Sequence, residues 1–172
     1  DAGSKTEEVY KLNKLDDIIK WCKENNKELW QYVEECEGKE IWNHLKDILD
    51  TMHNAVSEGI EKDGILPGKL KLQRRAKGFY DKIKGQHNYH VITKKIFAYA
   101  VAEQNSSAGT IVTAPTCGAA GVIPGLLRAM REEHSLDEET CLKALAIGGL
   151  IGNLIKQNAT ISGAEAGCQA EI

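Results

Sequence analysis

Residues 41–56 read IWNHLKDILDTMHNAV, and this stretch has the clearest periodicity in the chain. Its apolar residues recur every three or four positions, at Ile41, Leu45, Ile48, Leu49, Met52 and Val56. This spacing places them on one face of an α-helix. Shorter patterns of the same kind precede it in residues 15–22 and 29–36. The first third of the chain is therefore predicted to form amphipathic helices.

Three more helices are expected further along the chain, over residues 87–104, 122–131 and 135–157. Pro124 suits the first turn of a helix, where its missing N–H leaves no hydrogen bond unmade. Ser135 and Glu138 have the spacing of an N-terminal capping box. The strand-like signal is confined to the β-branched run over residues 110–113. The pattern predicts an all-α, multi-helix domain with glycine-rich, cysteine-bearing loops.

The last predicted helix contains Gly148, Gly149 and Gly152. Glycine costs roughly 1 kcal/mol relative to alanine in the interior of a helix. Because glycine lets two backbones approach each other closely, we expect contact with a neighbouring helix to offset this cost.

Length and composition indicate one globular domain. The chain has 172 residues, of which 42% are hydrophobic and 27% are charged, as in ordinary folded proteins. Charged residues number 36 in residues 1–104 and only 11 in residues 105–172. We interpret residues 1–172 as a single helical domain, with N-terminal helices in residues 1–50. Residues 51–172 would be the portion that carries the chemistry, truncated at its C-terminal end.

Charge and hydropathy exclude nucleic acid and membranes as expected partners. The net charge of −3 provides no basic field that would attract nucleic acid or an anionic membrane. The longest apolar stretch, residues 144–155, is shorter than the roughly 20 residues needed to cross a bilayer. The chain opens without an apolar signal region, and its cysteines lie too far apart for a disulfide framework or a zinc knuckle. These features predict a cytoplasmic protein in a reducing compartment.

The five cysteines fall into two groups. Cys22, Cys36 and Cys141 occupy apolar positions of helical patterns and are expected in the core. Cys117 and Cys168 lie in loops rich in glycine and alanine, which leave space around the sulfur for a large metal cluster. A free cysteine is most often a small buried hydrophobic residue, and composition alone favours that simpler interpretation for both loops.

Arginine and histidine residues add two candidate sites. The basic run over residues 69–77 contains Arg74 and Arg75. Guanidinium groups match carboxylates bidentately, so the run indicates either a solvated surface or a carboxylate-binding site. The histidines show no metal-binding motif, and only His53, just before the turn region over residues 59–68, lies near candidate loops. No nucleotide-binding motif is present, and neither cysteine-bearing loop contains a lysine for pyridoxal phosphate.

Three motifs resemble those of the bacterial iron–sulfur L-serine dehydratases. Residues 113–125, TAPTCGAAGVIPG, resemble the TAPTxGAxGxxPG loop of that family. Residues 161–171, ISGAEAGCQAE, are similar to its SGAExGCQxE segment. Residues 52–76 contain GILPG at 64–68 and RRA at 74–76, and they resemble an upstream motif of the same family. The three motifs occur in the family's order, and the resemblance extends from about residue 50 to the end of the chain.

The resemblance implies an α chain, or the α portion of a single-chain enzyme, with an all-helical fold. Such an enzyme converts L-serine to pyruvate and ammonia with a [4Fe–4S] cluster that is held by three cysteines and keeps one iron open. Cys117 and Cys168 would be cluster ligands, and a further ligand is expected beyond residue 172. Unless Cys141 is recruited, the chain by itself should be an inactive fragment without the cluster. A β chain or β domain and a homo-oligomer are the implied partners.

Elimination from serine requires a Lewis acid at the hydroxyl group and a base at Cα. The resemblance leaves the base unassigned, with His53, Ser107 and Thr116 as candidates. Substrate contacts are expected from hydroxyl and guanidinium groups in and near the motifs, namely Ser106, Ser107, Thr113, Thr116, Arg74 and Arg75. Glu165 and Gln169 would support the neighbouring ligand Cys168.

Two alternative functions stay open at the level of the sequence. A cluster enzyme of the same fold could act on another amino acid, such as cysteine with release of sulfide, and a comparison of the two substrates would distinguish them. A non-catalytic helical interaction domain would use its glycine and alanine surfaces only for packing. In that case, replacing Cys117 and Cys168 together would leave the iron content unchanged.

Overall fold

The computed structural model describes residues 9–86, 89–113, 116–159 and 167. It contains the helices α1 (Leu15–Asn25), α2 (Leu29–Glu37), α3 (Ile41–Glu61), α4 (Ala76–Ile83), α5 (Tyr89–Asn105), α6 (Val122–His134) and α7 (Glu138–Asn158). No strand forms in the described residues, and their only β-type pairing is a single bridge between Ile65 and Gln73. The all-α prediction is confirmed. Among the described helices, none combines the length and the apolar character needed to span a bilayer.

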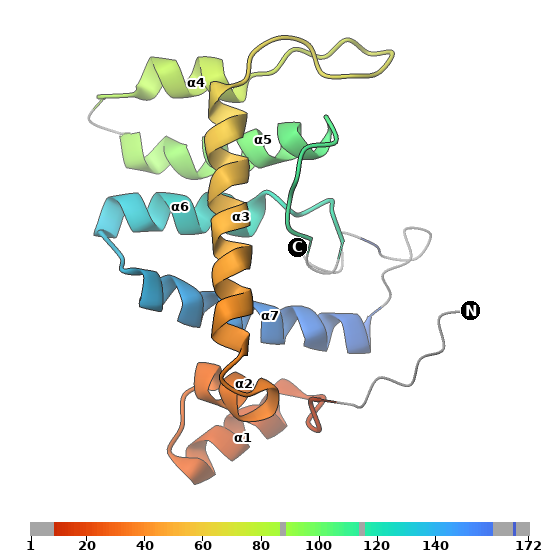
Figure 1. Cartoon of the computed structure of the whole chain (residues 1–172), viewed down its shortest axis with the longest axis vertical. Coiled ribbons are helices and arrows are strands. Elements are labelled where there is room, and N and C mark those ends of the chain that lie inside the picture. Colours follow the sequence, from red (N-terminus) through yellow and green to blue (C-terminus); the bar gives the residue numbers. More distant parts are fainter. Residues whose placement is uncertain (1–8, 87–88, 114–115, 160–166, 168–172) are drawn as a thin grey trace.

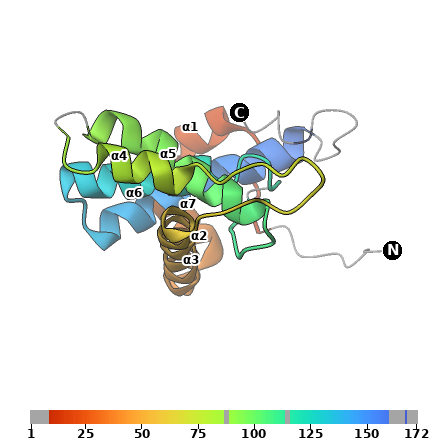
Figure 2. The same cartoon turned by 90° about the horizontal axis from the view of Figure 1, so that it is seen from above.

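Helix α3 is the axis of the fold (Figure 1). Helices α4, α5 and α6 lie across its upper half, α7 crosses its lower half, and α1 and α2 cover its lower end. Seen from above, α3 stands on one side of the stack formed by α4, α5 and α6 (Figure 2). Because α5 contacts α3, α4 and α6, it is the central element of this upper part.

Two apolar clusters hold the helices together. The larger one joins α1, α2, α7 and the first half of α3, with Ile18, Val33, Leu49 and Leu150 among its buried residues. The smaller one joins the second half of α3 to α5 and α6, and its buried residues are Ala55, Val56, Phe97, Val101 and Ala129. Helix α3 runs through residue 50 without a break and contributes to both clusters.

Three cysteines lie where their helical patterns predict. Cys22 and Cys141 are buried within the larger cluster, and Cys36 is half-buried against it. Their assignment to the core is confirmed.

Backbone contacts through glycine fix the position of α5. Gly59 of α3 abuts the backbone of Ala100, while Gly121 and Gly125, at the start of α6, abut the backbone of Ala98. A Cβ added to Gly125 would lie 2.6 Å from the backbone nitrogen of Ala98. No larger residue fits at this position, so α5 and α6 approach each other as closely as their backbones allow.

The glycines of α7 do not make the close contact that was expected of them. Among the described residues, a Cβ added to Gly148 would meet its nearest neighbouring atom at 3.9 Å, and one added to Gly149 or Gly152 would meet no atom within 4 Å. The expectation is wrong because the glycines border a cavity. Cys141 and Leu145, one or two turns earlier on the same face of α7, are buried in the core.

The start of α6 follows its sequence signal, but the start of α7 does not. Pro124 lies in the first turn of α6, as predicted. Ser135 does not begin α7; it ends α6 in a left-handed conformation with φ 51°. Asp137 caps α7 by accepting a hydrogen bond of 2.8 Å from the backbone nitrogen of Thr140. Glu138 is therefore the first residue of α7, and the predicted capping box is wrong.

Helix α4 has no clear signal in the sequence, because it is short and contains Gly78 in its interior. It forms through tertiary contacts with α5, where the ring centre of Tyr80 lies 6.0 Å from that of Phe97, and it buries Ala76 and Ile83 near its two ends. The Glu103 side chain of α5 also caps its first turn.

We predict opposite effects for two glycine-to-alanine substitutions in helices. Gly125→Ala should lower the free energy of unfolding by about 1 to 3 kcal/mol, because its Cβ would collide with the backbone of α5. Gly149→Ala has open space and should raise it by about 0.5 to 1 kcal/mol through helix propensity. Urea unfolding followed by circular dichroism measures both, and equal effects would contradict the packing described here.

Candidate active site

The segment over residues 62–75, here called the arm, connects α3 to α4 and projects from the molecule between them (Figure 1). The backbone nitrogen of Arg74 donates to the carbonyl of Gly64 at 2.9 Å, which closes the arm at its base. Gly64 and Gly68 have φ values of +103° and +116°, a region that favours glycine. The turn predicted over residues 66–68 is part of this arm. Closure of the arm brings Arg74 beside the last turn of α5.

Arg74 is held by two side chains of the α5 end. Gln104 is 1% exposed, and its amide nitrogen donates to Glu58 Oε2 at 2.7 Å. Its amide oxygen accepts from Arg74 Nη1 at 3.5 Å, and Arg74 Nη2 donates to the hydroxyl of Ser107. Among the described residues, no carboxylate forms an ion pair with Arg74. The half-buried guanidinium group is therefore oriented but not neutralised.

Glu103 connects the same turn of α5 to the start of α4. The residue is 6% exposed, and its Oε1 accepts from the backbone nitrogens of Arg75 at 2.6 Å and Ala76 at 3.3 Å. These N–H groups have no partner inside the helix, so the carboxylate caps α4. Its Oε2 is buried and has no hydrogen-bond partner in the described part of the chain. The Arg-Arg-Ala motif is thus fixed to α5 by its backbone.

Asn105 fixes the loop that carries Cys117. Its side-chain nitrogen donates to the carbonyl of Cys117 at 2.9 Å, and the backbone nitrogen of Gly109 donates to the carbonyl of Gln104 at 2.8 Å. Cys117 is exposed and is followed by the small residues Gly118 and Ala119. The last turn of α5 therefore joins the arm, the start of α4 and the cysteine-bearing loop in one place.

The family model of the serine dehydratase alpha chain matches residues 10–172. The chain belongs to this family. It is 38% identical to the L-serine dehydratase of Haemophilus influenzae, over 95% of this chain and 38% of that protein. It is 41% identical to the L-serine dehydratase of Streptomyces coelicolor, over 77% of this chain and 30% of that protein. L-serine dehydratase 2 of Escherichia coli is 34% identical, over 95% of this chain and 38% of that protein. The chain thus spans less than two fifths of the length of these relatives.

The end of α5 brings some of the expected substrate contacts together and leaves others apart. Arg74 and Ser107 are hydrogen-bonded to each other. Arg75 adjoins them, but its exposed side chain has no hydrogen bond or ion pair among the described residues. The hydroxyl of Ser106 is exposed and donates to the carbonyl of the preceding helical turn at 2.9 Å. The structure therefore favours Arg74 over Arg75 as a carboxylate ligand.

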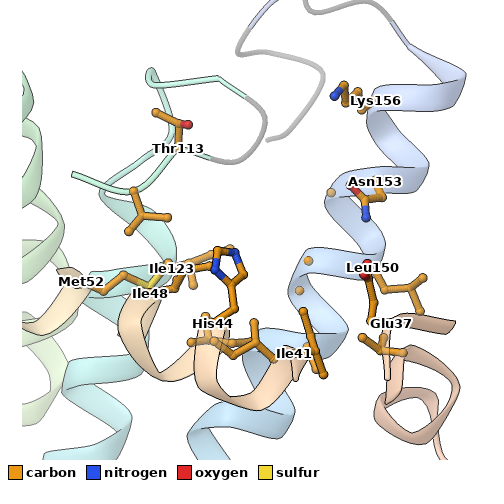
Figure 3. Close-up of a pocket in the computed structure, with 18 of the residues that line it drawn as sticks. Glu37, Ile41, His44, Ile48, Met52, Thr113, Ile123, Leu150, Asn153 and Lys156 are labelled. Carbon is orange, nitrogen blue, oxygen red and sulfur yellow. The ribbon is translucent and has the colours of Figure 1, made fainter. Parts of the chain in front are cut away.

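A cavity of about 500 Å³ lies between α3, α7 and the segment that precedes α6 (Figure 3). His44 points into it from α3, with Thr113 on one side and Lys156 on the other. The glycines of α7 line its wall, and their missing side chains keep the space open. Thr113 lies four residues before Cys117, so the cavity and the α5 end flank the same loop. Thr113 is thus placed apart from Arg74 and Ser107, on the cavity side.

The structure says little about the other residues predicted for the site, which are Thr116, Glu165, Cys168 and Gln169. Thr116 is half-buried beside Cys117. Glu165, Cys168 and Gln169 lie outside the described residues.

Sequence reasoning missed Glu103, Gln104 and Asn105, which organise the candidate site. A signal for them exists, because three consecutive polar residues follow the largely apolar run over residues 96–102. Gln104 follows the buried Ala100 by four positions and therefore falls on the same face of α5. A polar residue on a buried face needs a hydrogen-bond partner, and this requirement could have pointed to the site.

The described cysteines differ in their fitness as metal ligands. Burial raises the pKa of the Cys22, Cys36 and Cys141 thiols, which disfavours the thiolate that a metal requires. Cys141 is fully buried in the core, so the structure argues against its recruitment as a replacement ligand. Cys117 is the exposed thiol of the described chain. Within those residues, no three His, Cys, Asp or Glu side chains are close enough to hold a metal ion.

His53 lies at the contact between α3 and α6, where its Nδ1 is 3.3 Å from Arg131 Nη1. Arginine only donates hydrogen bonds, so Nδ1 accepts and Nε2 carries the proton. That Nε2 is buried without a partner among the described residues. Burial, together with Arg131 and Arg128, lowers the pKa of His53 below its usual value of 6.5. His53 is therefore held neutral at this helix contact, and no hydrogen bond among the described residues joins it to the α5 end.

We predict that His53 makes folding sensitive to acid. Above pH 6.5 the imidazole is neutral in both states and its contribution to stability is fully present. As the pH falls, the unfolded chain binds a proton that the folded chain resists, so stability is lost until the pH passes below the folded-state pKa. His53→Gln should flatten this dependence in urea unfolding between about pH 7.5 and about pH 5. An equal flattening by His44→Gln, on the same helix, would contradict this assignment.

Proposed function

We propose that the chain is the α portion of an L-serine dehydratase, which converts L-serine to pyruvate and ammonia. Relatives that bear this name match most of the chain. The single structural observation that carries the proposal is the guanidinium group of Arg74, which is fixed by Gln104 and Ser107 and lacks a carboxylate partner in the described chain. An α-amino acid supplies that carboxylate.

The reaction removes the Cα proton and the Cβ hydroxyl group of serine, and the resulting enamine becomes an imine that water hydrolyses to pyruvate and ammonia. Water is lost and regained, so the atoms balance. In this proposal, Arg74 binds the substrate carboxylate through N–H groups that Gln104 and Ser107 do not use. Fixing one end of the substrate presents Cα and the hydroxyl group in a constant orientation.

We infer that Cys117 and Cys168 are ligands of a [4Fe–4S] cluster, with a further ligand from the rest of the protein. Cys117 fits this role because its thiol is exposed, small residues follow it and Asn105 holds its carbonyl group. Glu165 and Gln169 adjoin Cys168 in sequence and would support it. When bound, the cluster supplies a Lewis acid for the hydroxyl group of serine.

The proposed partners follow from the family and from the length of its members. The chain spans less than two fifths of the relatives, so we propose that a β chain or β domain and further α-portion residues complete the enzyme. We also propose a homo-oligomer in the cytoplasm, where reducing conditions protect the exposed thiol of Cys117.

We predict that the complete enzyme, reconstituted with iron and sulfide in the absence of oxygen, absorbs broadly in the visible range and forms pyruvate from L-serine. Cys117→Ser should lower the bound iron and sulfide and abolish pyruvate formation, because the site loses an exposed thiolate. Cys36→Ser, at a half-buried position of the core, should retain both. If the enzyme releases sulfide from L-cysteine and does not convert L-serine, L-cysteine replaces L-serine as the proposed substrate.

We predict that Arg74→Met lowers kcat/KM for serine roughly 100-fold, mainly through KM, because it removes a bidentate contact with the carboxylate. Arg75→Met should change kcat/KM less than about twofold, since no partner engages its side chain among the described residues. Steady-state kinetics of the two variants measures the difference. The reverse ranking would assign the carboxylate to Arg75.

A further inference from the structure

Gln104 has one defined orientation because its two neighbours have opposite hydrogen-bonding capacity. An ionised carboxylate only accepts hydrogen bonds, and a guanidinium group only donates them. Glu58 therefore faces the amide nitrogen of Gln104, at 2.7 Å, and Arg74 faces the amide oxygen, at 3.5 Å. Rotation of the amide by half a turn would place its oxygen against the carboxylate of Glu58 and its nitrogen against the guanidinium group of Arg74. Two acceptors would then face each other at one end and two donors at the other.

Glu58 is itself fixed at the end of α3. Its Oε2 accepts from Lys62 Nζ at 2.9 Å as well as from Gln104. The hydrogen bond from Lys62 is the main cause that lowers the pKa of Glu58, so the carboxylate stays ionised near neutral pH. Glu58 lies on the exposed side of this chain of contacts, while Gln104 lies on the buried side.

These contacts form a line from Lys62 through Glu58 and Gln104 to Arg74. At its far end, one N–H of the guanidinium group is directed at Gln104 and another at Ser107. Two anchors define the plane of the guanidinium group. Its other N–H groups have no partner in the described residues and keep a fixed direction.

We propose that Gln104 is a positioning residue that transmits the orientation of Glu58 to Arg74 and thereby aims Arg74 at the substrate carboxylate. This inference rests on the proposed function, and it adds two residues, Glu58 and Gln104, that no family motif described above assigns to substrate binding. A purely structural role for Gln104 would stabilise the fold without affecting how the enzyme binds serine.

The substitution Glu58→Gln in the complete enzyme tests the proposal. A glutamine at position 58 can donate as well as accept, so position 58 no longer selects the orientation of the Gln104 amide, and only the longer contact with Arg74, at 3.5 Å, still does. We expect KM for L-serine to rise about tenfold, with kcat changed less than about twofold. Glu61→Gln is the matched control, because it removes the same charge from the same helix and Glu61 has no hydrogen bond or ion pair among the described residues. This control should keep the wild-type KM.

A double-mutant cycle separates positioning from structural support. Gln104→Met and Arg74→Lys should each raise KM, and the double variant should resemble Arg74→Lys alone if Gln104 acts through Arg74. Additive effects on KM in the double variant, or an unchanged KM in Glu58→Gln, would overturn the positioning role. The proposed function would still stand in that case, provided that the wild-type enzyme converts serine. Absence of serine turnover by the wild-type enzyme would overturn the proposed function, and the positioning role with it.

Discussion

Ala98 and Ala100 of α5 touch the backbones of two other helices, because Gly59 in α3 and Gly121 and Gly125 at the start of α6 offer no side chain. This double contact sets the depth at which α5 lies between its neighbours. Once the depth is fixed, the last turn of α5 contacts four segments: the end of α3, the arm, the start of α4 and the loop that carries Cys117. The candidate site is built from those four contacts.

The polar residues of that turn serve both folding and chemistry. Gln104 and Glu103 are buried, so each side chain needs partners to offset the loss of hydration. Their partners, Glu58, Arg74 and the first N–H groups of α4, come from segments more than 25 residues away in the sequence. The same hydrogen bonds that satisfy buried groups therefore bring the motif residues together. Stability and the geometry of the site depend on the same atoms.

The sequence predicted the helices whose apolar residues recur regularly, such as α3, and it placed Cys22, Cys36 and Cys141 correctly in the core. It did not predict α4, which depends on a cap from Glu103, and it misplaced the start of α7, where Asp137 competes with Ser135. Periodicity reports burial along one helix but not contacts between segments. For the same reason, Arg74 and Ser107 were predicted as substrate contacts from the chemistry of their side chains. Gln104, which joins them to α3, was not predicted, because its role depends on contacts between segments.

The arm is a loop whose base is closed and whose tip is free. Arg74 and Gly64 are hydrogen-bonded at its base, whereas Leu70 at the tip is 82% exposed. The entropy cost of closing a loop rises only slowly with its length. Insertions near the tip are thus compatible with an unchanged guanidinium position, while one extra residue between Arg74 and Ala76 would break the register with Glu103. Chain length near Leu70 is separable from the chemistry at the base, so the exposed tip can change while the hydrogen bonds of Arg74 stay in place.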